Sequence, residues 1–213
     1  FNLKFIEHDR IISVSDDRTT KLWNIDYNNK SFTVDTFIGH SARVWDATIM
    51  DNILISVSED CTGRLYDLNK KTFIKELSGH IGKNVRALAV NKDAIFTGGE
   101  DNMIIKWEFK KLLSNNTGET VLEYDLDEKS KQCLLAKEKQ KNFSPSIKVL
   151  KITNDKIIIG TNHGEVLLID YLTNKSVTSV FSDSETRVIN SIDYIEEINT
   201  ILVGLSDGQI ASI

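Results

Sequence analysis

The sequence lacks the material that several classes of protein require. Of its 213 residues only two are cysteine and one is proline, and its longest apolar runs are far shorter than the ~20 residues that cross a bilayer. Cys61 and Cys133 form no CxxC pair, which excludes a disulfide framework and favours reduced thiols. With 40% hydrophobic residues, the chain is neither a disordered tail nor a collagen-like fibre. We expect a soluble, cytoplasmic, globular chain with no membrane partner.

Positive charge is also in short supply. The 26 Lys and Arg residues are outnumbered by 31 Asp and Glu residues, giving a net charge of -5. Phosphate binding depends mainly on Lys and Arg, so this balance argues against a chain that grips nucleic acid over its whole surface. The overall balance does not exclude nucleic-acid binding at a local basic patch.

A repeated pattern is the strongest signal present. A hydroxyl residue is followed four positions later by Asp, and an aromatic residue comes six positions after that Asp. The three copies are Ser13, Asp17 and Trp23; Ser56, Asp60 and Tyr66; and Thr97, Asp101 and Trp107. Gly39-His40 and Gly79-His80 add a second marker, 40 residues apart. Weaker copies place Ile169 six residues after His163 and Ile213 six residues after Asp207.

The spacing of the repeat predicts the architecture. Successive aromatic positions are separated by 43, 41, 62 and 44 residues, and a period of about 40 to 45 is typical of propeller blades built from four antiparallel strands. We predict an all-β propeller with about five blades represented and truncated at both ends. Strands are expected at 43–49, 53–57, 85–90 and 147–152. The predicted blades are 1–30, 31–67, 68–108, 147–170 and 171–213, with a basic insertion at 109–146.

These residues resemble the WD-repeat β-propellers. The resemblance implies a hydrogen-bonded network in each blade, formed by a His of the Gly-His loop, a Ser or Thr, the turn Asp and a Trp. It assigns His40, Ser56, Asp60 and Tyr66 to one blade, where Tyr replaces the usual Trp, and His80, Thr97, Asp101 and Trp107 to the next. The first blade has Ser13, Asp17 and Trp23, and its His would precede Phe1. The last two blades cannot form the network, so we expect them to rely on packing.

No catalytic or metal-binding pattern emerges. HExxH and paired CxxC motifs are absent, and Gly79-His80-Ile81-Gly82-Lys83 departs from the spacing of a phosphate-binding loop. The adjacent carboxylates Asp16-Asp17, Glu59-Asp60 and Glu100-Asp101 recur in every clear repeat, which indicates a structural role. We therefore expect a protein that is not an enzyme and has no cofactor, metal or small-molecule substrate.

Two surfaces are candidates for binding. The family resemblance implies that one mouth of the propeller is the docking face, and here it presents Asp16, Arg43, Trp45, Glu59, Asn84, Arg86 and Glu100. An aromatic residue beside an Arg is typical of a binding hot spot, although Trp45 could equally pack in the core. The second candidate is a basic loop, an expected RNA or partner contact, with Lys129, Lys131, Lys137, Lys139 and Lys141.

Several strings resemble one branch of the family more closely. Residues 15–18, 39–45, 58–61 and 79–88 are similar to the first propeller of the WD-repeat, non-catalytic subunits of tRNA wobble-position ribose 2′-O-methyltransferases. That resemblance implies a scaffold that docks a separate methyltransferase subunit and helps position tRNA. The alternative is a general WD-repeat scaffold, such as a ubiquitin-ligase or signalling adaptor, that binds a peptide at the same mouth. A propeller enzyme is a third class, disfavoured by the missing catalytic cluster.

Overall fold

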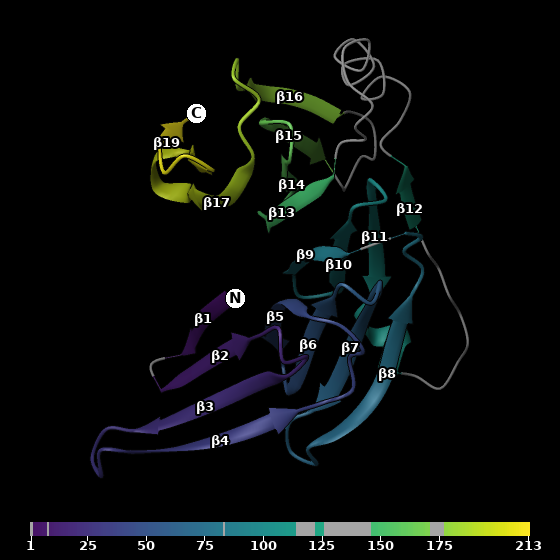
Figure 1. Ribbon diagram of the computed structural model, residues 1–213, viewed down its shortest axis with the longest axis vertical. Helices are drawn as coiled ribbons and strands as arrows, with labels where there is room; N and C mark the ends of the chain where they lie inside the picture. Colours follow the sequence, from purple (N-terminus) through teal and green to yellow (C-terminus); the bar gives the residue numbers. More distant parts are fainter. Residues whose placement is uncertain (1, 8, 83, 114–121, 126–145, 171–176) are drawn as a thin grey trace.

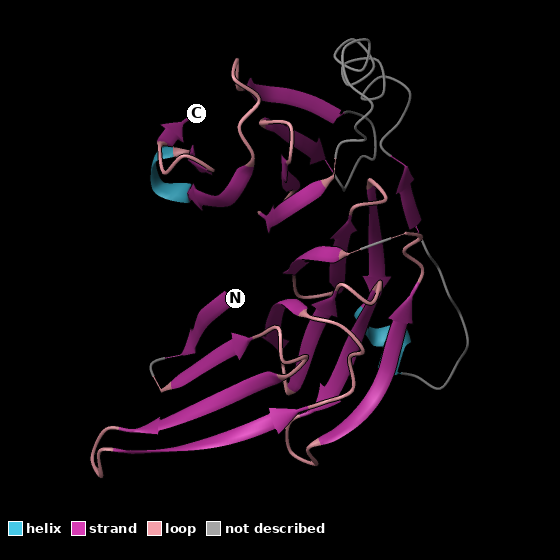
Figure 2. Cartoon of the chain, viewed as in Figure 1, coloured by secondary structure: helices cyan, strands magenta, loops and turns pink. Residues whose placement is uncertain are grey.

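The fold is almost entirely β-strand (Figure 2). The computed structural model describes residues 2–7, 9–82, 84–113, 122–125, 146–170 and 177–213. Within these residues the strands form five antiparallel sheets, four with four strands and one with three. The all-β, five-bladed propeller predicted from the repeat is confirmed. No helix in these residues is both long and apolar enough to span a membrane.

Each sheet uses strands that are consecutive in the chain. The first contains β1 (Asn2–Glu7), β2 (Arg10–Val14), β3 (Thr20–Asp26) and β4 (Ser31–Phe37). The second contains β5 (Val44–Met50), β6 (Ile53–Ser58), β7 (Thr62–Asp67) and β8 (Thr72–Ser78). The third contains β9 (Val85–Val90), β10 (Ala94–Gly99), β11 (Met103–Glu108) and β12 (Leu122–Asp125).

The remaining sheets follow the same order. The fourth contains β13 (Ile147–Ile152), β14 (Lys156–Thr161), β15 (Glu165–Asp170) and β16 (Val177–Ser182), and the fifth contains β17 (Ile189–Ile195), β18 (Thr200–Leu205) and β19 (Ile210–Ser212). A short helix α1 (Phe109–Leu113) follows β11, and a 3-10 turn η1 (Glu196–Ile198) joins β17 to β18. The strands predicted at 43–49, 53–57, 85–90 and 147–152 correspond to β5, β6, β9 and β13.

The sheets succeed one another along an arc (Figure 1). The first strand of each sheet lies at the centre of this arc, where β5 packs against β1, β9 against β5, β13 against β9, and β17 against β13. The outer strand β4 begins at residue 31, so the sequence repeats and the sheets are offset by one strand. This arrangement brings residues that are about 40 positions apart in sequence together around one axis.

The core lies between successive sheets. Every residue of β6 and of β10 is buried, because each of these strands is covered on both faces by a neighbouring sheet. Their sequences, ILISVS and AIFTGG, are accordingly almost continuous apolar and small residues. The outer strand β4, SFTVDTF, is largely exposed and mixes polar with apolar residues. Burial thus falls from the second strand of a blade toward its outer edge.

The turn between the second and third strands has the same backbone geometry in every sheet. The residue that follows the turn Asp position has a positive φ: 71° at Arg18, 70° at Cys61, 65° at Asn102, 75° at Gly164 and 88° at Gly208. This left-handed conformation is strained for residues with a Cβ, so its recurrence indicates a turn held by its surroundings. The turn places the preceding Asp where its carboxylate can bond back to the blade.

Candidate functional site

The third sheet contains the complete hydrogen-bonded network expected from the sequence. Trp107 Nε1 donates to Thr97 Oγ1 at 3.0 Å, and His80 Nε2 lies 2.8 Å from that same hydroxyl. His80 Nδ1 donates to Asp101 Oδ2 at 2.9 Å. Asp101 also accepts from the backbone N–H of Ile81, which ties the loop before β9 to the β10–β11 turn. These residues join strands of one blade and are not arranged around a reaction centre.

The second sheet has the same network with one change. His40 Nδ1 donates to Asp60 Oδ2 at 2.8 Å, and His40 Nε2 lies 2.9 Å from Ser56 Oγ. Tyr66, at the Trp position, instead donates its hydroxyl to the backbone oxygen of Ile38 at 3.2 Å. The tyrosine therefore leaves the network and fixes the loop that carries His40.

The first sheet retains the part of the network that its own residues supply. Trp23 Nε1 donates to Ser13 Oγ at 2.8 Å. Asp17 accepts from the backbone N–H and the hydroxyl of Thr19, which closes the β2–β3 turn. These bonds hold the turn even though no His is paired with Asp17 among the described residues.

The carboxylates of these networks are held ionised. Burial raises the pKa of Asp60, but hydrogen bonds from His40 and Thr62 outweigh burial and hold that pKa well below its usual range. Burial likewise raises the pKa of Asp101, and bonding to His80 more than offsets it, so the net pKa is lowered. Their recurrence in two blades and their low pKa values suit hydrogen-bond acceptors in a structural network and not general bases.

The fifth sheet corrects one expectation. We predicted that the last two blades rely on packing, but Arg187, ahead of β17, donates to Asp207 Oδ2 at 2.6 Å and to Asp183 Oδ1 at 2.8 Å. Hydrogen bonds from Arg187 lower the pKa of Asp183 to about 2. An arginine here performs the task that His40 performs in the second blade, linking the loop before the first strand to the turn Asp. Because an arginine takes the place of the histidine, the repeat pattern did not reveal this bond in the sequence.

The first strands of four successive sheets share a β-bulge near their start. In each strand the second residue is skipped in the pairing with the next strand, while its neighbours remain paired. The skipped residues are Trp45, Arg86, Lys148 and Asn190. Bulges commonly redirect a side chain at a functional site. We call these four residues the bulge ring.

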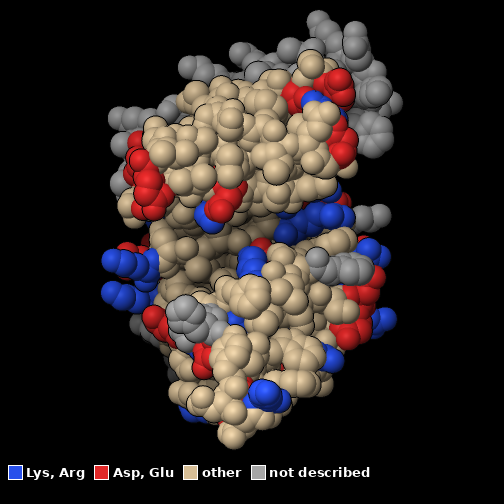
Figure 3. Space-filling view, turned by 90° about the vertical axis from the view of Figure 1, so that its left-hand side faces the viewer, with Lys and Arg blue, Asp and Glu red and all other residues tan. Residues whose placement is uncertain are grey.

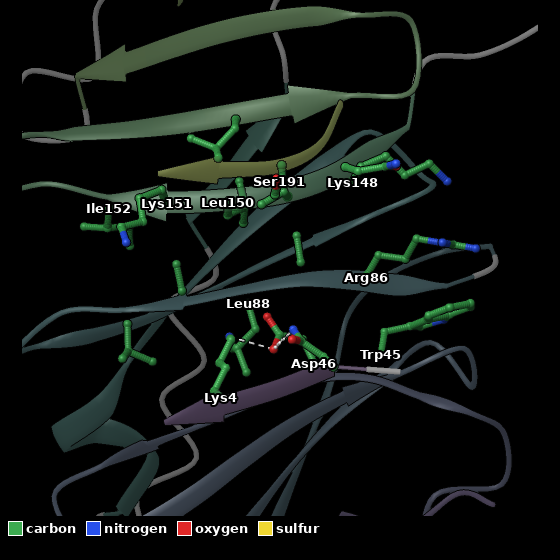
Figure 4. Close-up of a pocket in the computed structure, with 17 residues that line it drawn as sticks. Lys4, Trp45, Asp46, Arg86, Leu88, Lys148, Leu150, Lys151, Ile152 and Ser191 are labelled. Atoms are coloured by element: carbon green, nitrogen blue, oxygen red, sulfur yellow. Dashed lines mark hydrogen bonds and ion pairs between the residues drawn. The ribbon is translucent and has the colours of Figure 1, made fainter. Parts of the chain in front are cut away.

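The bulge ring opens onto one cavity. A cavity of about 550 Å³ is lined by residues of the first strands of all five sheets, including all four members of the ring. Figure 4 shows Trp45, Arg86 and Lys148 grouped at one end of it, with Lys151 at the opposite end. Figure 3 shows Lys and Arg side chains in the hollow on this side of the molecule. Five blades thus contribute to one concave surface.

Trp45 is held by contacts with both neighbouring arginines. The guanidinium carbon of Arg86 lies 3.8 Å from the centre of the Trp45 ring, and that of Arg43 lies 5.1 Å from it. Trp45 Nε1 donates to Asn84 Oδ1 at 3.0 Å. The ring is half-buried, which answers the question left open by the sequence: Trp45 is neither fully core nor free on the surface.

Ion pairs join the predicted mouth residues. Arg43 Nε lies 2.6 Å from Glu59 Oε2 and 3.5 Å from Asp16 Oδ1, which links the first two blades. Arg86 Nε lies 3.2 Å from Glu100 Oε1. All seven predicted mouth residues therefore take part in one connected set of contacts, since Asn84 is bonded to Trp45. These contacts stabilise the mouth itself. Its role as a binding surface is a proposal.

The sequence analysis missed Lys148 and Asn190. Lys148 lies in the strand predicted at 147–152, but its blade and that of Asn190 lack the Gly-His marker from which the mouth residues of the second and third blades were assigned. A usable signal was present for Lys148, which precedes His163 by fifteen residues, as Trp45 precedes Asp60 and Arg86 precedes Asp101. The basic loop with Lys129, Lys131, Lys137, Lys139 and Lys141 lies outside the described residues.

Deeper in the cavity an ion pair between the half-buried Lys4 and the buried Asp46 connects the first two blades. Lys4 Nζ lies 2.6 Å from Asp46 Oδ1, and Asn2 Nδ2 donates to the same oxygen at 3.0 Å. Burial raises the pKa of Asp46, and the charge of Lys4 opposes that shift. No group of three or more His, Cys, Asp or Glu side chains in the described part of the chain is placed to hold a metal ion.

Two segments of the chain match a known repeat profile. The profile of the WD domain, G-beta repeat, matches residues 31–67 and 71–108. Over 114 residues, 50% of the chain, the sequence is 29% identical to the tRNA (34-2'-O)-methyltransferase regulator WDR6 of Bos taurus and 28% identical to that of Homo sapiens. Over 108 residues, 47% of the chain, it is 33% identical to the nuclear distribution protein nudF of Aspergillus niger. The matched part spans 10% of the length of the WDR6 relatives and 23% of nudF.

Proposed function

We propose that this chain, a five-bladed β-propeller that contains WD40 repeats, is a non-catalytic scaffold that binds a partner protein at the mouth carrying the bulge ring. In its finer form, the proposal is that the partner is the catalytic subunit of a tRNA ribose 2′-O-methyltransferase and that the scaffold helps position tRNA for modification of the anticodon wobble nucleotide. The methyl donor and the catalytic residues would then belong to the partner. A cytoplasmic location is part of the same proposal.

The observation that carries the binding proposal is the shared bulge in four first strands. It turns one side chain per blade toward a common cavity, and the set combines a Trp, an Arg, a Lys and an Asn. Trp and Arg are the residue types most enriched in binding hot spots. Packing alone does not require a polar or charged residue at this position, so a binding role accounts for the pattern better.

The tRNA role has a separate support. Similarity to proteins named as regulators of a tRNA methyltransferase favours an RNA-modification partner over a general adaptor. The alternative remains a general WD-repeat scaffold that binds a peptide at the same mouth. Similarity to nudF and the mixture of arginine with carboxylates at the rim favour that alternative.

One capture experiment separates the two proposals. The full chain is tagged, recovered from its native cell extract, and analysed for bound proteins by mass spectrometry and for bound RNA by sequencing. Recovery of a methyltransferase together with tRNA is the expected result. Recovery of ubiquitin-ligase or signalling components without RNA would reject the tRNA role and leave the scaffold proposal standing.

Replacing Trp45 with alanine should weaken capture of the partner at least about tenfold, because truncation of a central aromatic hot spot commonly costs ~2 kcal/mol or more. The fold should persist, since the ring is only half-buried. Phe73→Ala is the matched control: Phe73 also lies under an arginine, with the guanidinium carbon of Arg64 5.3 Å from its ring centre, but it belongs to the outer strand β8. Loss of the folded state in Trp45→Ala, measured by thermal melting, would assign Trp45 to the core.

A further inference from the structure

Two members of the bulge ring share a single counter-charge. Arg86 Nε lies 3.2 Å and Lys148 Nζ lies 3.6 Å from the same oxygen, Glu100 Oε1. The Lys148 side chain is 19% exposed and that of Arg86 is 28% exposed, so water screens the pair only in part. One carboxylate therefore faces two partly buried cations.

Each of the other cations discussed at the cavity or its rim has at least one carboxylate of its own. Lys4 lies 2.6 Å from Asp46, and Lys151 lies 2.7 Å from Asp193. Arg43, at the rim, has Glu59 and Asp16 as partners. Among the described residues that line the cavity or its rim, the unmatched positive charge is therefore concentrated at Arg86 and Lys148.

The electrostatics of Lys148 agree with this assignment. Burial lowers the pKa of its ammonium group, the nearby charge of Arg86 lowers it further, and Glu100 compensates only in part. The charge of a bound anion would offset both effects, because it would supply a second negative charge beside the two cations.

The geometry also prepares Arg86 to bind an anion. The Trp45 ring lies 3.8 Å from its guanidinium carbon, and Arg86 Nε is buried without a well-formed hydrogen bond. Stacking on an aromatic ring restricts the guanidinium to one plane, and a planar fork of N–H donors matches the oxygens of a phosphate. Lys148 adds a point charge, and Asn190, the next member of the bulge ring, lines the same cavity with an amide.

We propose that Arg86 and Lys148, with the amide of Asn190 lining the same cavity, form a phosphate-binding site at its mouth. The ligand group is a phosphate, whether carried by a free inorganic ion or by the backbone of an RNA strand. Glu100 occupies the site in the absence of ligand and gives way to the phosphate when it binds. This site does not depend on the identity of the partner protein proposed above.

The test is a titration of the full chain with two probes, inorganic pyrophosphate and a short single-stranded RNA, at constant ionic strength. Calorimetry or the fluorescence change expected from Trp45 reports binding. Lys148→Gln should weaken binding of the productive probe about tenfold, because a charge-assisted hydrogen bond is lost. Glu100→Gln should strengthen it about threefold, because the competing carboxylate is removed.

Lys151→Gln is the matched control. Lys151 comes from the same strand as Lys148 and lines the same cavity, but it already has Asp193 as its partner. Its replacement should change affinity by less than about twofold, as expected for an exposed ion pair. Equal losses in Lys148→Gln and Lys151→Gln would show diffuse electrostatic attraction and overturn the site.

The two probes distinguish the sources of the phosphate. Saturable binding of pyrophosphate that Lys148→Gln weakens supports a site for a free phosphate compound. Binding of the RNA alone, with the same sensitivity to the substitution, supports a backbone phosphate. Failure of both probes to bind overturns the proposal, even if the partner protein is still captured at the mouth.

Discussion

Replacing Gly98 with valine should lower the free energy of unfolding by about 3 kcal/mol, the upper part of the usual range for an overpacked core. A Cβ built on Gly98 would lie 2.7 Å from Ile147 Cγ2 and 3.1 Å from Leu150 Cδ1, which is closer than side chains approach without displacement. Both neighbours belong to the next blade and are buried in the core between the third and fourth sheets. Chemical denaturation of the two proteins measures the difference.

This expectation follows from complementary side-chain volumes at the blade interfaces. The residue at this point of the second strand faces the first residue of the next blade's first strand, and where one side chain is smaller the other is larger. The pairs are Val14 with Val44, Val57 with Val85, Gly98 with Ile147, and Gly160 with Ile189. Valine meets valine in the first two interfaces, whereas glycine meets the larger isoleucine in the next two.

A double variant tests this explanation. Combining Gly98→Val with Ile147→Val recreates the valine pair of the first two interfaces. The double variant should be more stable than the sum of the single effects predicts by about 1 kcal/mol, since residues in contact couple by that order. Additive effects of the two substitutions would contradict the proposed complementarity of side-chain volumes.

Replacing Asp60 with alanine should destabilise the protein by about 1 to 3 kcal/mol, because buried donors that bonded to it lose their acceptor. Asp60 accepts from His40 Nδ1 and from the backbone N–H of Ser41 and of Thr62. Asp26→Ala is the matched control: Asp26 also accepts from turn N–H groups, at Asn28 and Asn29, but in an exposed turn with no His. An unchanged melting temperature in Asp60→Ala would refute the structural role of this network.

The effect of Asp60→Ala should also depend on pH. A carboxyl group whose pKa is lower in the folded state than in the unfolded state contributes its full stabilisation above the unfolded pKa, which is about 4 for Asp. That contribution is lost as the pH falls below about 4 toward the folded pKa. The stability difference between wild type and Asp60→Ala should therefore shrink below about pH 4, as measured by denaturation at several pH values. A stability difference that stays constant or grows as the pH falls would contradict this expectation.

The sequence predicted best the blades whose hydrogen-bonded network includes an Asp in a tight turn. Asp60 and Asp101 each lie in a tight turn, four residues after the hydroxyl residue and six before the aromatic residue of the repeat, so a single period indicated the second and third blades. The apolar pattern located β6, whose continuous apolar sequence follows from burial on both faces.

The part that sequence reasoning missed depends on contacts between blades. A β-bulge is a feature of strand pairing and not of composition, so only its spacing from His163 distinguishes Lys148 from other lysines, and no such spacing marks Asn190. The bond between Arg187 and Asp207 replaces an imidazole with a guanidinium and therefore breaks the motif while keeping its role. The close approach of Gly98 to Ile147 joins residues 49 positions apart, which only the packed sheets bring together.

The central claim is that the bulge ring is a binding surface, and site-specific crosslinking tests it most directly. A photoreactive residue placed at Asn190, whose side chain is exposed within the ring, is compared in native extract with the same residue placed at Phe73 on the outer strand β8. The account predicts that position 190 crosslinks to the methyltransferase subunit and that position 73 does not. Crosslinks to that subunit from position 73, with none from position 190, would contradict it.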